Sequence, residues 1–187
     1  TTQVAALATT QINGLTETNI GALTETQAAA LTTTQISGLN ATASKAFVAT
    51  QIAAMTTTQT RAFSATQLSA LDTTDMAEFT ETQVAALTTT QVAGISSTNF
   101  AALVETQVAA LTATQVATIS TGAIGAMTET QVGAMTTTQV AALSATQLRS
   151  LSTTNVSALD SAQVGALTVT QVAGFTTTQL NALDTTD

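Results

Sequence analysis

The stretch Leu87-Thr88-Thr89-Thr90-Gln91-Val92-Ala93-Gly94 is the plainest copy of an eight-residue unit that recurs from one end of the chain to the other. Steps of eight from Gln3 define 24 positions, of which 17 are Gln, and these are all the Gln residues in the chain. No residue is inserted or deleted anywhere in this register. A short fixed period is the signature of a repeat architecture, so residues 1–187 are predicted to form a single continuous octapeptide-repeat domain.

Each position of the octad carries a characteristic residue type. The residue after the Gln position is usually Val or Ile, and the fourth residue after it is always large and apolar, most often Leu. Small residues, mostly Ala, Gly or Ser, lie between these two apolar positions. The chain begins and ends inside the octad, so we expect it to be a piece of a longer array.

The composition excludes several classes of protein. Charged residues make up 7% of the chain, and three Lys and Arg stand against eleven Asp and Glu, which gives a net charge of −8. Such an acidic chain would repel nucleic acid, so we expect no nucleic-acid partner. A polar residue interrupts every octad, so there is no apolar run of the roughly 18 residues that a transmembrane helix requires. Neither Cys nor His is present, which removes thiolate chemistry and the commonest general base.

A long helix does not explain the octad. At about 100° per residue, eight residues advance about 800°, so the apolar positions would precess by about 80° in every unit. No apolar stripe would form, and only heptad or eleven-residue periods sustain a coiled-coil seam. A β-solenoid is the serious alternative, because Thr and Val favour strands and Thr-x-Thr recurs, as in Thr16-Glu17-Thr18. Ile20 and Leu23 would then face opposite ways unless every unit turned a corner between them.

Very short capped helices give every repeated residue a function. The residue after the large apolar position is nearly always Thr, Ser, Asp or Asn, which are the preferred N-cap residues. Gln follows three residues later, and Ser/Thr-x-x-Gln is a capping box. With Thr88 as N-cap, Gln91 becomes N3, while Leu87 and Val92 form a hydrophobic staple across the cap. Thr136 and Gln139 form the equivalent box.

Helices of two turns are unstable alone in water, so the units must stack. The predicted fold is all-α: a solenoid, or superhelix, with one capped helix per octad and several octads per coil. The large apolar positions should line a thin continuous core, and the small residues should allow close approach of neighbouring coils. The predicted core includes Leu87, Val92, Leu103, Val108 and Leu143.

Candidate sites for chemistry are few. The densest acidic cluster is Asp72, Asp75, Glu78 and Glu81, and carboxylate oxygens are calcium ligands. It has no Gly-rich turn and no EF-hand spacing, however, and acids at a cap or in a first turn suit the helix dipole. We therefore predict no metal site there, no catalytic residues and no cofactor. The three cations are scattered and are expected to be solvated, and the chain is predicted not to be an enzyme.

The units Leu87–Gly94 and Met135–Ala142 resemble the low-complexity octad arrays of very large bacterial surface and secreted adhesin-like proteins. The resemblance implies an extracellular or cell-surface segment that serves as a stalk, spacer or self-assembling filament. Open array ends expose apolar surface, so we expect self-association end to end or laterally. The alternative function is ice binding or another surface-binding role, because regular Thr-x-Thr rows resemble those on ice-binding solenoids.

Overall fold

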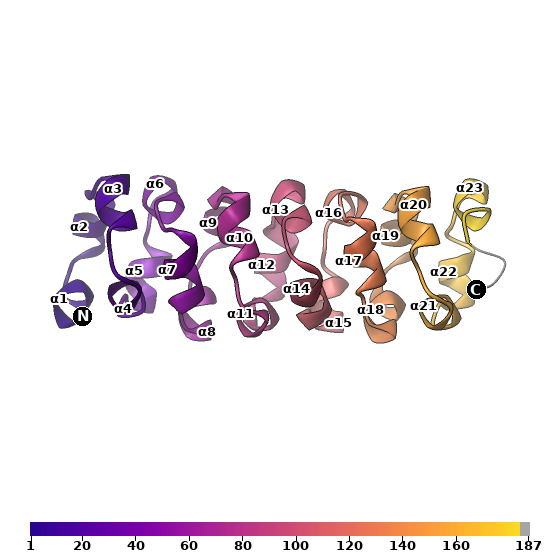
Figure 1. Ribbon diagram of the computed structural model, residues 1–187, viewed down its shortest axis with the longest axis horizontal. Coiled ribbons are helices and arrows are strands. Elements are labelled where there is room, and N and C mark those ends of the chain that lie inside the picture. The colour runs from indigo at the N-terminus through magenta and orange to yellow at the C-terminus, as the bar shows by residue number, and fades with distance from the viewer. Residues whose placement is uncertain (184–187) are drawn as a thin grey trace. The chain divides into compact units, whose positions relative to one another are not determined.

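The computed structural model describes residues 1–183, and within them it contains 23 short α-helices and no strand (Figure 1). The predicted all-α class is confirmed, and the β-solenoid alternative is wrong. The chain divides into two compact units, Thr1–Ile95 and a second unit that starts at Ser96.

The helices are four to six residues long and follow one another at the period of the octad. The first unit contains α1 (Thr2–Ala5), α2 (Thr9–Asn13), α3 (Glu17–Gly21), α4 (Glu25–Ala28), α5 (Thr33–Ser37), α6 (Ala41–Lys45), α7 (Ala49–Ala54), α8 (Thr57–Thr60), α9 (Ala65–Ala70), α10 (Thr73–Ala77), α11 (Glu81–Ala86) and α12 (Thr89–Gly94). The second contains α13 (Ser97–Ala101), α14 (Glu105–Ala110), α15 (Ala113–Val116), α16 (Thr121–Gly125), α17 (Glu129–Gly133), α18 (Thr137–Ala142), α19 (Ala145–Ser150), α20 (Thr153–Ser157), α21 (Ser161–Gly165), α22 (Val169–Val172) and α23 (Thr177–Leu180).

Helix α12 shows how the octad encodes one element. Thr88 has extended backbone angles, φ −74° and ψ 157°, and its side chain accepts a hydrogen bond from the Gln91 N–H. The helix then runs for six residues and stops at Gly94, because Ile95 returns to the extended region with ψ 131°. Ser96, the N-cap of α13, is extended as well, so two extended residues separate α12 from α13 and let the chain turn there. A period of eight therefore generates a coil rather than a long helix.

The core consists of the two apolar positions of each octad. Leu87, Val92, Leu103, Val108 and Leu143 are all buried, as are the Phe, Met and Ile residues that replace Leu elsewhere. In a typical octad the Val side chain at the end of the first helical turn is buried. The Leu side chain in the extended connection after the helix is buried as well. Most octads contribute both side chains to this thin core; Ser44 and Thr60 replace the apolar residue at the Val position of two octads.

Neighbouring coils meet through helices three units apart. In the first unit α6 packs on α9, and α9 packs on α12; in the second unit α13 packs on α16 and α16 on α19. Side-chain amides reach further, from a helix to the end of the helix four units before it, as described below. A coil therefore contains between three and four octads, which the sequence period alone did not specify.

The small residues between the apolar positions allow this close packing. A Cβ atom placed on Gly94 would lie 2.4 Å from the Cβ of Ala65, in the coil before it. Gly174 meets Ala145 in the same way, at 2.6 Å. Both pairs are 29 residues apart, so the contact belongs to the packing of one coil on the next.

Candidate functional site

The side-chain amide of the repeated Gln caps its own helix through its oxygen. In α18 the Thr136 N–H donates to Gln139 Oε1 at 2.7 Å, and the Gln139 N–H donates to Thr136 Oγ1 at 3.2 Å. Thr88 and Gln91 have the same reciprocal pair of bonds, at 2.7 and 3.2 Å. The first N–H groups of a helix have no partner within the helix, and each box satisfies two donors at one end.

The nitrogen of the same amide caps a different helix. Gln139 Nε2 donates to the carbonyl oxygens of Leu111, Val108 and Ala109, at 2.6, 2.9 and 3.1 Å. These carbonyls lie at the end of α14, four units earlier in the chain. The last carbonyls of a helix also lack partners within it, so one Gln side chain satisfies the start of its own helix and the end of a helix in the preceding coil.

The same arrangement repeats through both units. Twelve Gln side chains are no more than 5% exposed, and each donates at 2.6–2.8 Å to the carbonyl 28 residues before it. We call them the glutamine ladder: Gln35, Gln51, Gln59, Gln67, Gln83, Gln91, Gln131, Gln139, Gln147, Gln163, Gln171 and Gln179. A buried amide is tolerated only when its donors and acceptor are bonded, and the ladder meets this condition by joining successive coils.

Two positions where another residue replaces Gln, Asn155 and Ala43, show which of the ladder's hydrogen bonds are kept when the side chain is shorter. Asn155 donates to the carbonyl of Met127 at 2.8 Å but, within residues 1–183, makes no bond back to the N–H of its N-cap. At the Ala43 position there is no amide, and the preceding coil supplies one instead. The N–H of Asn40 donates to Asn13 Oδ1 at 3.0 Å, and Asn13 Nδ2 donates to the Gly38 carbonyl at 3.0 Å.

Asp75 is the most unfavourable substitution in the ladder. It is 4% exposed, and its Oδ2 has no hydrogen-bond partner within residues 1–183. Burial, and secondarily the negative charge of Asp72, raises the pKa of Asp75 to about 6, and a hydrogen bond from the Asp72 backbone offsets this rise only in part. A carboxylate has no proton to donate to the carbonyls of a preceding coil. The position therefore carries an unsatisfied polar atom where the other units carry a bonded amide.

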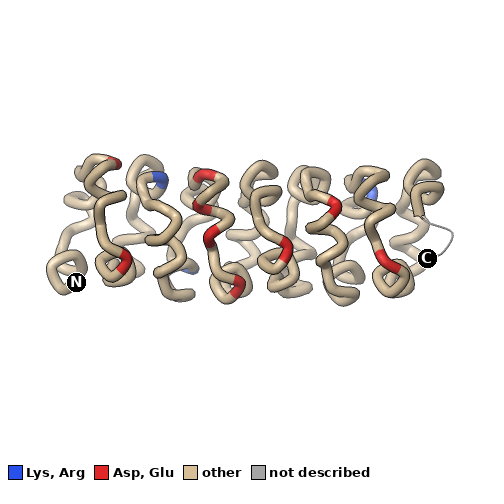
Figure 2. The backbone as a smooth tube through the Cα atoms, in the orientation of Figure 1, with Lys and Arg blue, Asp and Glu red and all other residues tan. Residues whose placement is uncertain are grey.

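The other acidic candidates do not gather into a metal site. Figure 2 shows acidic residues spread through both units, with a run of them along α10 and into α11. Asp72 is the N-cap of α10, Glu81 lies in the first turn of α11, and Glu78 and Glu81 are exposed. Among residues 1–183 no group of three or more His, Cys, Asp or Glu side chains is placed to hold a metal ion.

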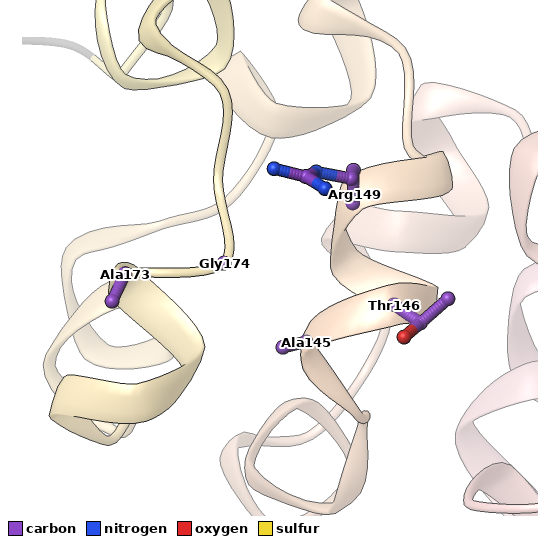
Figure 3. A pocket seen from close by; sticks show the side chains of 5 residues that line it. All are labelled: Ala145, Thr146, Arg149, Ala173 and Gly174. Carbon is purple, nitrogen blue, oxygen red and sulfur yellow. The ribbon is translucent and has the colours of Figure 1, made fainter.

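A hollow of about 310 Å³ in the second unit is lined by Ala145, Thr146, Arg149, Ala173 and Gly174. In Figure 3 the Arg149 side chain extends toward the segment at Gly174, whereas Thr146 points away from it. The lining contains one cation and one hydroxyl and no carboxylate. It therefore offers no pairing of a nucleophile with a base.

Comparison with known proteins supports the repeat. Residues 114–145, 137–169 and 145–177 match the model of the ALTTAQ repeat family, so residues 114–177 are similar to a tandem array of that repeat. Comparisons with curated proteins and with solved structures gave no match. No helix within residues 1–183 is long and apolar enough to cross a membrane.

The sequence pattern located the capping boxes and the core but not the second function of Gln. One signal was available. A Glu side chain at N3 would also close a capping box, yet no Glu occupies the Gln position in any octad, although Glu occurs elsewhere in the repeat, as at Glu81 and Glu129. The absence of Glu from this position indicates that a side chain with a donor as well as an acceptor is favoured there, although Ala43 and Asp75 lack a donor.

Proposed function

We propose that this chain is a non-enzymatic structural repeat segment that acts as an extracellular stalk or spacer, or as a self-assembling filament or adhesin region. The glutamine ladder is the observation that supports the proposal. Its twelve buried side chains form the same bond, from one coil to the coil before it, and this bond attaches successive coils of the array. A spacer requires this property, because its length is set by the number of identical coils.

The chemistry of the chain supports a non-enzymatic role. Most of its buried polar side chains are Gln residues that cap helices, and its exposed surface is mostly Thr, Ala and Ser. The hollow lined by Arg149 and Thr146 contains no acid or base partner. The extracellular setting is supported by the resemblance to surface arrays. Labelling of intact cells of the source organism with an antibody against the chain tests it; labelling only after permeabilisation would reject an extracellular location.

The spacer function predicts that length changes in steps of one coil. Deletion of residues 113–144, four whole octads, preserves the register and removes slightly more than one coil. Since packed helices are about 8–10 Å apart, we expect the maximum dimension in dilute small-angle X-ray scattering to fall by roughly 10 Å. Deletion of 28 residues breaks the octad phase and serves as the control, because it should destabilise the fold. An unchanged maximum dimension after the 32-residue deletion would reject a spacer.

Ice or surface binding is the second candidate, and one observation favours it. Wherever Thr precedes the Gln position within residues 1–183, from Thr2 through Thr90 to Thr178, its side chain is exposed. These hydroxyl and methyl groups repeat at the period of the helices. Thermal hysteresis measurements test the candidate. Wild-type protein without thermal hysteresis at high concentration would reject it, and replacement of the exposed Thr residues by Ser should abolish any activity found.

A further inference from the structure

One coil-to-coil position in the first unit departs from the glutamine ladder. Each ladder side chain donates to the carbonyl 28 residues before it, so the carbonyl that corresponds to Asp75 is that of Phe47, just after the end of α6. The octad that contains Phe47 is itself degenerate, because Ala43 and Ser44 replace the usual Gln and Val. We call the Asp75 carboxyl together with the Phe47 carbonyl the acid joint.

The second unit contains a related pair of residues, 80 positions later in the chain. Residues 65–75 read ATQLSALDTTD, and residues 145–155 read ATQLRSLSTTN. Asn155 therefore corresponds to Asp75, and its Nδ2 donates to the Met127 carbonyl at 2.8 Å. Asn and Asp side chains have the same length and shape. The bond of Asn155 thus indicates that an Asp side chain at this position can also reach the carbonyl 28 residues before it.

Asp75 occupies this position without the proton that the bond requires. Its side chain is 4% exposed, and its Oδ2 has no hydrogen-bond partner within residues 1–183. The carboxyl also accepts a hydrogen bond from the Asp72 backbone, as the oxygen of a repeated Gln caps its own helix. An ionised Oδ2 would place one acceptor against another, and a buried polar atom without a partner destabilises the folded state. The neutral acid, in contrast, has one O–H to donate.

We propose that Asp75 carries a proton when the first unit is fully packed and donates it in a hydrogen bond to the Phe47 carbonyl, so that the acid joint closes on protonation and opens on ionisation. Uptake of one proton from solvent converts Oδ2 from an unpaired acceptor into a donor. Release of that proton leaves a buried carboxylate opposite a carbonyl oxygen. Separation of α10 from the end of α6 then lets water solvate the charge.

The surroundings of Asp75 favour the neutral acid. Burial is the main reason that the pKa of Asp75 is raised to about 6, and the charge of Asp72 raises it further. Neither α7, which packs on α10, nor α9, which packs on α6, has an ionisable side chain. Glu78, Glu81 and Lys45 are exposed, so solvent screens their charges. The acid joint should therefore be closed below about pH 6 and open above it.

Amide hydrogen exchange of the whole chain tests the acid joint. Exchange is followed by mass spectrometry at pH 5 and pH 7.5 and corrected for the intrinsic exchange rate at each pH. With a pKa of 3.8 for the solvated carboxyl and about 6 for the buried one, the opening equilibrium should increase about tenfold between these pH values. We expect this increase in α6 and α10. The corresponding helices α16 and α20 should show no change, because Asn155 donates at either pH.

Two matched variants isolate the proton. Asp75→Asn supplies a permanent donor, as Asn155 does in the second unit, and should keep α10 equally protected at both pH values. Glu78→Gln is the control, since it removes the same charge from an exposed residue at the end of the same helix. It should leave the tenfold change intact. Carbon-13 NMR of the side-chain carboxyls adds a direct readout: one carboxyl should titrate near pH 6, and Asp75→Asn should remove that titration.

Any one of four results would overturn the inference. They are equal corrected exchange of α10 at both pH values in the wild type, an equal pH effect in α20, a pH effect that persists in Asp75→Asn, and the absence of a carboxyl that titrates near pH 6. None of these measurements depends on the length of the array. The acid joint and the proposed spacer function can therefore fail separately.

Discussion

The carbonyl oxygen of Leu111 lies 2.6 Å from Nε2 of Gln139, a short bond between residues 28 positions apart. This bond joins the end of α14 to the start of α18. The Gln139 amide also holds the Thr136 N–H at 2.7 Å. Local capping and coil-to-coil attachment therefore depend on the two ends of one carboxamide group.

Replacement of Gln139 by Glu should separate these two functions. The carboxylate still accepts from the Thr136 N–H, but it donates nothing to Leu111 and adds charge beside three carbonyls. We expect a loss of about 2–4 kcal/mol in the free energy of unfolding, as for a buried polar group left without its partner. Chemical denaturation measures it. Part of the loss should be recovered at acidic pH, where the protonated acid can donate again.

Gln11→Glu is the matched control, because Gln11 is exposed and its Nε2 has no acceptor within residues 1–183. We expect the free energy of unfolding to change by no more than about 0.5 kcal/mol at low protein concentration, as at an ordinary surface position. Equal losses from Gln11→Glu and Gln139→Glu would show that the coil-to-coil bonds contribute nothing measurable.

Substitutions at two N-cap positions should change the free energy of unfolding in opposite directions. Thr88 accepts from the Gln91 N–H, so Thr88→Ala should cost about 0.5–2 kcal/mol. Val104 occupies the same position with no acceptor in its side chain, and it is exposed, so Val104→Thr should stabilise by about 1 kcal/mol. Both are measured by thermal or chemical unfolding. A Val104→Thr variant less stable than wild type would contradict the capping interpretation.

Asp75 makes stability depend on pH. Its pKa is raised to about 6 in the folded chain from 3.8, so between these values the folded state binds more protons than the unfolded state. The contribution of Asp75 to the free energy of unfolding therefore falls as pH rises from about 4 to about 6. The total decrease is at most about 3 kcal/mol. Asp75→Gln should remove this dependence and stabilise the protein at neutral pH. Unfolding of both proteins at pH 4.5 and 7.5 measures it.

The control for the Asp75 experiment is Glu129→Gln, which makes the same change of charge at an exposed position. At neutral pH this substitution should change the free energy of unfolding by no more than about 0.5 kcal/mol. If Asp75→Gln proved no more stabilising than Glu129→Gln at pH 7.5, the unpaired buried carboxylate would not be a liability.

Close packing of coils predicts different outcomes for two Gly-to-Ala changes. Gly94→Ala would bring a Cβ to 2.4 Å from the Cβ of Ala65, so the coils must separate, and we expect a loss of about 1–3 kcal/mol. Apart from its chain neighbours and the backbone of its own helix, no atom of residues 1–183 lies within 4 Å of the equivalent point on Gly165. Gly165→Ala should therefore stabilise its helix by up to about 1 kcal/mol. Differential scanning calorimetry compares them; equal shifts of Tm would argue against a tight contact at Gly94.

The sequence by itself determined the local structure. The Thr and Gln positions predicted where each helix begins, because a capping box is a bond between residues three apart and needs no other part of the chain. The extended N-cap before each helix and the burial of residues such as Leu87 and Val92 also follow from the octad. The period of eight excluded a long helix on geometry alone.

The tertiary structure decided how the coils are joined. It placed Gln139 Nε2 against Leu111, set between three and four octads per coil, and put Gly94 against Ala65. These contacts connect residues 28 to 31 positions apart, and a repeat of identical units fits any number of octads per coil until side chains are packed in three dimensions. The octad therefore specifies the helix and its caps, and the burial of the glutamine amide between coils specifies the array.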